Sequence, residues 1–144
     1  MRAIRAFLLV ILMVIIASCE SMQSSSMLGP RTVTLDGDQY SEQALGKFSS
    51  WRCKDFVRPA GILVEVGYFT EPLLTNLGFV LYDGGNVGSL SLYRREGLNH
   101  RWDWGQSANF SFIVKPDGTG LYYDFSSVPQ GERIKANDVY RCTQ

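Results

Sequence analysis

Few side chains in this 144-residue sequence are of types that carry out acid–base or nucleophilic chemistry. The nitrogen and sulfur ligands are one histidine and three cysteines, namely His100, Cys19, Cys53 and Cys142. This inventory is too small for a zinc site of the usual kind. The neighbours of His100 along the chain, Arg101 and Asp103, project to the opposite face of a strand, so they cannot orient the imidazole. Histidine-dependent catalysis is therefore not expected.

Paired carboxylates are the other chemistry to consider, because two nearby acids can share general acid and base roles. Asp117, Asp124 and Glu132 are close enough in the sequence to meet at one end of a small fold. Nothing in the sequence indicates surroundings that would perturb their pKa values, so solvated loop charges are the favoured interpretation. The sequence also lacks a GxSxG nucleophile turn and a phosphate-binding glycine loop. We therefore predict a protein that is not an enzyme and holds no cofactor or metal.

A third group of residues is suited to recognition. His100, Trp102 and Trp104 alternate along one segment, so they project from the same face, with Arg94 and Arg95 just before the preceding turn. If this face is exposed, the five residues form a binding surface, since Trp and Arg concentrate binding energy at interfaces. If it points inward, the aromatic residues belong to the core, the commoner arrangement for an aromatic stripe on a strand. Both interpretations stay open here.

The N-terminus has the pattern of an export signal. Residues 1–18 combine two arginines with an unbroken apolar run, residues 6–17, and end in small residues. As a helix the run is about 18 Å long, short of the roughly 30 Å hydrocarbon core of a bilayer. Ile16-Ala17-Ser18-Cys19 resembles the bacterial lipobox. In lipoproteins of that family the cysteine thiol receives a diacylglyceryl group, and the signal peptide is cut just before it.

This resemblance implies a lipid-anchored protein of the cell envelope. Two or three acyl chains, palmitate among them, make the anchor stable, because each buried methylene contributes about 0.8 kcal/mol. Inner-membrane lipoproteins typically carry aspartate after the cysteine; Glu20 stands there, so the resemblance favours the outer membrane, facing the periplasm. The chain balances 14 Lys and Arg against 14 Asp and Glu, which argues against a nucleic-acid partner. The expected partners are the membrane, through the anchor, and an envelope protein.

The remainder of the chain divides into a tether and one domain. Residues 19–39, rich in Ser, Met, Gly and Pro, are expected to be a lipidated flexible tether, although Val33-Thr34-Leu35 also fits a short edge strand. Residues 40–144 are expected to form the domain. Apolar and polar residues alternate there between turn signals, which predicts strands. The eight predicted strands cover residues 47–54, 62–69, 77–82, 87–94, 98–104, 109–115, 119–125 and 137–142.

Two cysteines indicate how these strands are arranged. With Cys19 acylated, Cys53 in the first strand and Cys142 in the last remain, and an oxidising compartment favours a disulfide over two free buried thiols. A disulfide requires Cα atoms within about 7 Å, so it brings the two ends of the meander together. The prediction is an all-β fold, a single small antiparallel eight-stranded meander barrel closed by a disulfide.

The interior of an eight-stranded barrel is either filled by side chains or holds one small ligand. The residues taken to face inward are large, namely Phe79, Leu81, Leu90, Leu92, Phe110, Phe112, Tyr123 and Phe125. They predict a mostly filled interior. A lipocalin-like carrier of a small apolar ligand is therefore an alternative to the first expectation, a non-catalytic protein-interaction or binding module.

The body of the chain resembles the membrane-bound inhibitors of C-type lysozyme. Like them it has a lipobox, a short tether and two bracketing cysteines, within Trp51-Arg52-Cys53 and Tyr140-Arg141-Cys142. The resemblance implies a disulfide-closed barrel that inserts a loop into the lysozyme cleft. The family's Ser-Gly-x-x-Tyr inhibitory motif is missing, and the nearest fragment is Gly120-Leu121-Tyr122. A lysozyme-inhibitor-like defence lipoprotein is therefore a second alternative.

Changing Cys19 to serine tests the anchor. Serine offers no thiol to acylate, so we expect Cys19→Ser to release the protein from membranes, as measured by fractionation and immunoblotting. Persistent membrane association of the variant would instead indicate an uncleaved N-terminal anchor.

Overall fold

The computed structural model describes residues 31–57, 63–126, 128–129 and 131–144. The expected signal peptide, the lipidated Cys19 and the first part of the expected tether lie outside these residues. The described elements are β1 (Thr32–Leu35), β2 (Asp38–Ser41), β3 (Phe48–Asp55), β4 (Leu63–Phe69), β5 (Leu77–Leu81), β6 (Val87–Glu96), β7 (Asn99–Trp104), the 3-10 turn η2 (Gln106–Ala108), β8 (Phe110–Val114), β9 (Thr119–Asp124) and β10 (Asp138–Thr143). No helix in the described part of the chain is long and apolar enough to cross a membrane.

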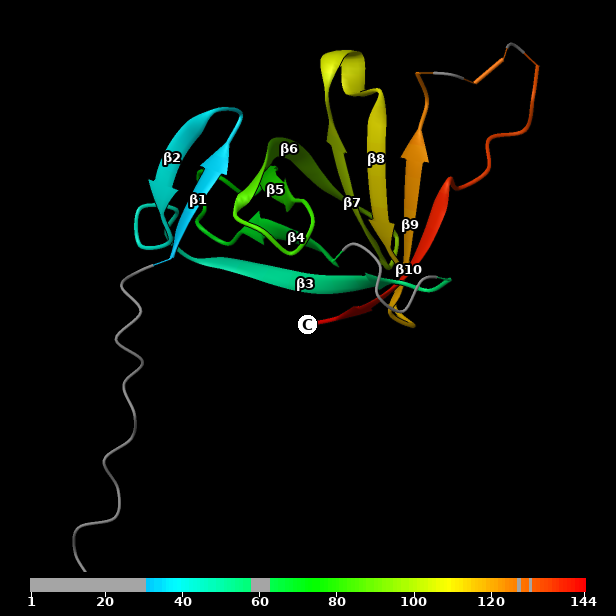
Figure 1. Cartoon of the computed structure of the whole chain (residues 1–144). Coiled ribbons are helices and arrows are strands. Elements are labelled where there is room, and N and C mark those ends of the chain that lie inside the picture. Colours follow the sequence, from blue (N-terminus) through cyan, green and yellow to red (C-terminus); the bar gives the residue numbers. More distant parts are fainter. Residues whose placement is uncertain (1–30, 58–62, 127, 130) are drawn as a thin grey trace, which may run out of the picture.

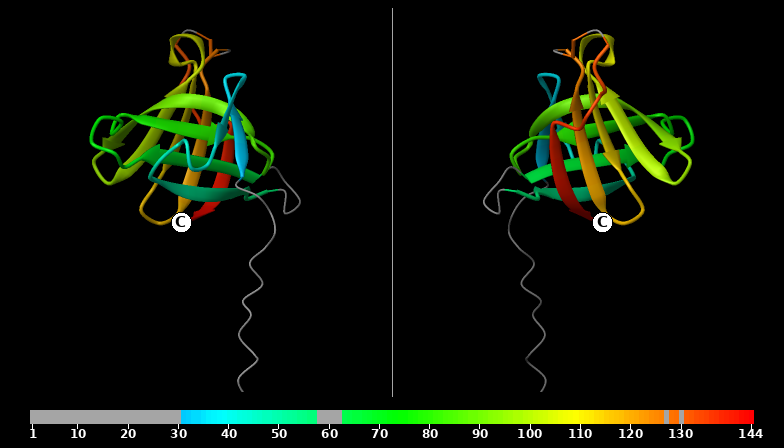
Figure 2. Two further views of the ribbon diagram at one scale, coloured as in Figure 1. Left: turned by 90° about the vertical axis from the view of Figure 1, so that its left-hand side faces the viewer. Right: turned by 90° about the vertical axis from the view of Figure 1, so that its right-hand side faces the viewer.

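Strands β3 to β10 form the predicted closed barrel (Figures 1 and 2). Each strand pairs antiparallel with the next along the chain, and β10 pairs antiparallel with β3 to complete the ring. All eight lie within two residues of the ranges expected from the sequence. Closure satisfies the backbone groups that an open sheet would leave unpaired at its two edges.

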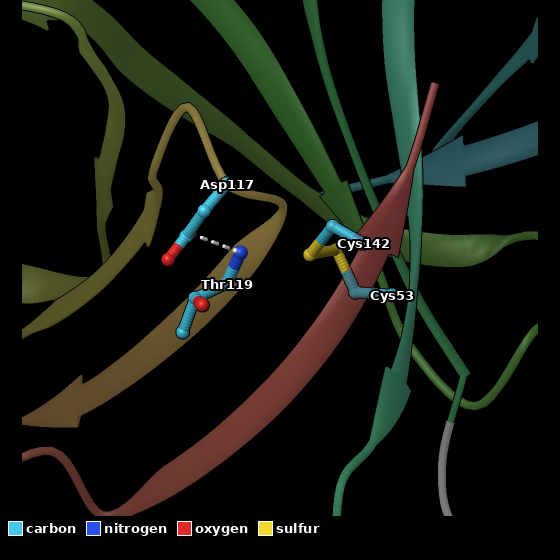
Figure 3. The surroundings of a disulfide bond; sticks show 4 residues. All are labelled: Cys53, Asp117, Thr119 and Cys142. Atoms are coloured by element: carbon cyan, nitrogen blue, oxygen red, sulfur yellow. Dashed lines mark hydrogen bonds between the residues drawn. A yellow bond between two sulfur atoms is a disulfide. The ribbon is translucent and has the colours of Figure 1, made fainter.

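A disulfide between Cys53 and Cys142 joins the first and last barrel strands, as predicted. The two residues are direct partners in the β3–β10 register, with their Cα atoms 4.0 Å apart. The backbone N–H of Cys142 donates to the carbonyl of Gly118, 2.8 Å away, so this residue also connects to the β8–β9 turn. Figure 3 shows that turn beside the disulfide. The bridge therefore lies within the barrel, near one of its ends.

The folded domain begins before the expected boundary at residue 40, because an N-terminal hairpin belongs to it. Residues 32–41 form β1 and β2, and β1 pairs parallel with β6, against the outside of the barrel (Figure 1). Val33 and Leu35 are buried there, and Leu35 has no exposed surface. They pack with Phe69, Phe79 and Leu81, which point outward from the barrel wall. Residues 31–39 are therefore part of the folded body, because two apolar side chains cover an apolar patch that would otherwise face water.

The barrel has its own core, separate from the one under the hairpin. Its members alternate along the strands with outward residues, as expected for a sheet with one buried face. Phe112 is buried in this core and Phe110 packs against it, as predicted. The inward assignment of Leu90 and Leu92 is wrong, since they are 39% and 56% exposed on the outer face of β6. It is also wrong for Phe79 and Leu81, which pack under the N-terminal hairpin, and for Tyr123, which alternates with the inward Tyr122 and stacks on Phe125. Alternation alone does not tell which of the two faces becomes the inner one.

We expect loss of the disulfide to destabilise the barrel strongly. Cys53 and Cys142 are separated by 89 residues, and the loop-entropy model assigns such a bridge about 4–5 kcal/mol. Cys142→Ser should lower the thermal midpoint by about 10 °C or more. The control Thr143→Ala, exposed on the same strand, should leave the midpoint unchanged. Equal midpoints for Cys142→Ser and wild type would contradict a stabilising role for the bridge.

Candidate functional site

Trp102 and Trp104 line the inside of the barrel, so the predicted exposed surface containing them is wrong. Trp102 has no exposed surface and Trp104 is 7% exposed. The indole N–H of Trp102 donates to the carbonyl of Gly67, 2.7 Å away. A side chain at Gly78 would collide with this ring, because its Cβ would lie only 2.8 Å from the indole nitrogen of Trp102. A glycine in β5 thus makes room for a tryptophan in the middle of the barrel.

His100 also faces inward, among aromatic rings near one end of the barrel. Arg95 Nη1 lies 2.6 Å from its Nε2, and Tyr93 Oη lies 2.7 Å from its Nδ1. A guanidinium only donates, so Nε2 accepts and the neutral ring carries its proton on Nδ1. The ring centroid is 4.4 Å from that of Trp51. Burial, and then the positive charge of Arg95, lower the pKa of His100. Both nitrogens have partners within the fold, which gives His100 a packing role.

Arg94 and Arg95 point to different places. Arg94 lies on the outer wall, where its guanidinium forms a 2.7 Å ion pair with Asp103. Arg101 binds the same carboxylate at 2.9 Å, and both arginines also contact Glu96 at 3.1 Å. Asp103 is only 3% exposed, so these arginines neutralise a buried charge. The five residues of the predicted surface therefore do not form one face: Arg94 lies outside the barrel, and the other four line its interior or its end.

An apolar hollow of about 370 Å3 lies inside the barrel, at the end opposite His100. Its mouth lies near the β7–β8 turn and the β9–β10 connection, which extend from the same end of the barrel in Figure 1. Six aromatic residues, two valines and two aspartates line it: Tyr82, Trp104, Phe110, Phe112, Tyr122, Tyr140, Val64, Val80, Asp83 and Asp138. The expected filled interior is therefore correct for the middle of the barrel and wrong for this end.

The rings on one side of this cavity pack against one another. Centroid distances are 5.8 Å from Trp104 to Phe110, 6.1 Å from Trp104 to Tyr122 and 6.5 Å from Phe110 to Tyr122. Burial raises the pKa of Tyr122, and the nearby carboxylates of Asp124 and Asp138 raise it further. The cavity thus combines an apolar wall with negative charge close to a tyrosine hydroxyl. Its volume is within the range of small-molecule sites.

A second hollow, of about 520 Å3, opens at the His100 end. Its lining includes Arg95, His100, Lys115 and Asp117, with Cys142 of the disulfide behind them. It is more polar than the first, and its histidine and arginine are already bonded to each other. The described residues contain no group of three or more His, Cys, Asp or Glu placed to hold a metal ion.

Of the three carboxylates considered for catalysis, Asp124 and Glu132 line one hollow beside the β9–β10 connection, and Asp117 lies at the opposite end of the barrel. Asp117 lies in the β8–β9 turn and Asp124 at the far end of β9, while Glu132 lies in the β9–β10 connection. Asp117 accepts the backbone N–H of Thr119 at 2.9 Å (Figure 3), and Asp124 accepts that of Ser126 at 2.9 Å. The hydrogen bonds from Thr119 lower the pKa of Asp117, and those from the hydroxyl and then the backbone N–H of Ser126 lower the pKa of Asp124. Both aspartates act as turn-forming residues, which agrees with the solvated-charge interpretation.

The fragment nearest to the lysozyme-inhibitor motif lies within a strand. Gly120 and Tyr122 belong to β9 and face the interior, where Gly120 lies against the Cys142 sulfur and the ring of Phe112. Trp51 and Tyr140 are likewise buried in the barrel core.

In comparisons with known proteins, no family model, curated protein or solved structure matches this chain.

Sequence reasoning placed Phe110 and Phe112 in the interior but missed most of the other residues that line the cavity, although one signal pointed to some of them. Asp138, Tyr140 and Cys142 alternate along one strand, so a disulfide inside the barrel places the other two inside as well. No comparable signal indicates Asp83, which lies in the β5–β6 turn, or the empty volume between the rings.

We expect His100 to make the stability of the fold depend on pH just below neutrality. Its pKa is about 6.5 in the unfolded chain and lower in the folded protein. The unfolded state therefore binds the proton more readily, and stability falls as the pH drops below about 6.5 toward the folded pKa. Thermal midpoints measured from about pH 7.5 to about pH 5.5 should fall less for His100→Gln than for wild type. Equal slopes for the two proteins would contradict this coupling.

Proposed function

We propose that this protein is a lipid-anchored binding module of the cell envelope that holds a small, largely apolar ligand in the open end of its barrel. The observation that carries the proposal is the cavity of about 370 Å3 walled by Trp104, Phe110, Phe112, Tyr122 and Tyr140. Apolar and aromatic walls with few polar groups are typical of small-molecule sites, which occur preferentially in places such as the mouths of barrels. The proposal takes up the lipocalin-like alternative raised by the sequence.

The anchor and the location of the protein are parts of the same proposal. They rest on Ile16-Ala17-Ser18-Cys19 and on Glu20, by resemblance to outer-membrane lipoproteins. An acylated N-terminus holds the barrel at the membrane surface, where lipids and apolar solutes are concentrated. A cavity with apolar walls suits a ligand taken from that environment.

The other functions expected from the sequence have less support. A surface for an envelope protein partner depended on Trp102 and Trp104, which are buried. Lysozyme inhibition depended on a motif whose nearest fragment, Gly120-Leu121-Tyr122, lies in a barrel strand. We also propose that the protein acts without catalysis, because His100 is held by Tyr93 and Arg95 and has no nucleophile beside it.

Filling the cavity tests the proposal. Val64 lines the cavity, so Val64→Phe should occupy part of it, whereas Val139→Phe adds the same bulk to the outer face of the barrel. Residues 20–144, exported behind a general signal peptide, keep every described residue and need no detergent. The probe is N-phenyl-1-naphthylamine, a neutral dye that fluoresces in apolar surroundings.

We expect wild type and Val139→Phe to bind one dye per chain. Val64→Phe should bind it about tenfold more weakly or worse, because the added ring takes up ligand volume. The comparison is made between variants whose thermal midpoints match wild type. Absence of saturable dye binding to wild type, or full binding by folded Val64→Phe, would refute a ligand site in this cavity.

A further inference from the structure

We propose that the ligand of this cavity is a cation, namely an ammonium compound with an apolar or aromatic body. This inference rests on the proposed function and names the class of ligand. It predicts that the ammonium group lies at the mouth, near Asp83 and Asp138, and that the apolar body lies inward among the rings.

The charges around the cavity are the first argument. Asp83 and Asp138 are the charged residues in its lining, which among the described residues contains no lysine, arginine or histidine. A third carboxylate, on Asp124, is close enough to Tyr122 to raise the pKa of its hydroxyl, as Asp138 also does. Carboxylates at the mouth of an apolar cavity attract a ligand whose positive charge lies beside them.

The aromatic wall is the second, independent argument. Aromatic faces carry a negative quadrupole and attract ammonium groups within about 6 Å of the ring centroid. Trp104, Phe110 and Tyr122 form one continuous group, with neighbouring centroids 5.8 to 6.5 Å apart. A tetraalkylammonium group needs such faces, since it has no N–H with which to satisfy a hydrogen-bonding site. The wall would suit an uncharged ligand as well, so the combination with the carboxylates is what favours a cation.

The opposite end of the barrel provides an internal contrast. The hollow there includes Arg95, Lys115 and His100 in its lining, with Asp117. The two ends therefore differ in sign, and only the apolar one is negative.

The test compares three compounds that share a phenyl ring and differ in charge. Phenyltrimethylammonium is the cation, tert-butylbenzene its neutral isostere, and benzenesulfonate an anion. Binding to residues 20–144 is followed by NMR through the indole N–H resonance of Trp104, which lines the cavity, with that of Trp102 as an internal reference. We expect the ammonium compound to bind about tenfold more tightly than its isostere, and benzenesulfonate not to shift the Trp104 resonance.

Variants then identify the source of the preference. Asp83→Asn/Asp138→Asn should bring the affinities for the cation and its isostere to within about threefold of each other. Asp83→Asn alone removes one charge from an exposed turn and should lower the affinity for the cation, even if the double variant folds poorly. Asp117→Asn makes the same chemical change at the opposite end and should leave the preference at its wild-type value.

The outcomes separate this inference from the proposed function. Equal binding of the cation and its isostere, or a preference retained by a folded double variant and by Asp83→Asn, would overturn the cation inference and leave the ligand site standing. Absence of binding by all three compounds, with the dye still bound, would do the same. Failure of the dye as well would overturn both proposals.

Discussion

The pairing of β10 with β3 is the constraint on which the rest of the structure depends. It turns a meander into a ring, and the disulfide between the directly opposed Cys53 and Cys142 holds that ring closed. Because side chains alternate along a strand, placing these two sulfur atoms inside also decides the face of their neighbours. Tyr140 and Asp138 therefore point inward from β10. The same register, passed from strand to strand, brings Trp102, Phe112 and Tyr122 to the interior.

The interior that results is filled unevenly. Trp102 occupies the middle, where its indole donates to Gly67 and lies against Gly78. Toward one end Trp51, Tyr68, Tyr93 and His100 stack closely, and toward the other the rings of Trp104, Phe110 and Tyr122 stay on one side of a cavity. The two halves have similar aromatic content and different packing. This difference is the physical basis for assigning ligand binding to one end and a structural role to the other.

Closure of the barrel also determines where the charged side chains lie. On the outer wall, Asp103 is buried beneath Arg94 and Arg101, and Glu65 beneath Arg31, so these ion pairs stabilise the sheet rather than present free charge. The arginine–histidine contact lies at one mouth, and aspartates lie at the other. The mouth with the aspartates is the one that opens into the apolar cavity. This mouth is the end of the barrel at which we propose that a ligand binds.

The local patterns in the sequence were sufficient to predict the strands and turns, because alternation and turn chemistry act over a few residues. They were also sufficient to predict the pairing of the two cysteines and the closed all-β fold, because the disulfide supplies the one long-range contact. These patterns were not sufficient to predict which face of each strand points into the barrel. Leu90 and Leu92 alternate as cleanly as Phe110 and Phe112, yet the first pair lies outside and the second within. The folded place of Val33 and Leu35 depends on an apolar patch contributed by distant strands. The cavity could not be predicted from the sequence either, because it is the volume left between rings from four strands and a turn, and no single segment encodes it. The sequence by itself determined that the chain closes into a barrel; only the tertiary packing decided which side chains fill it and which end stays open.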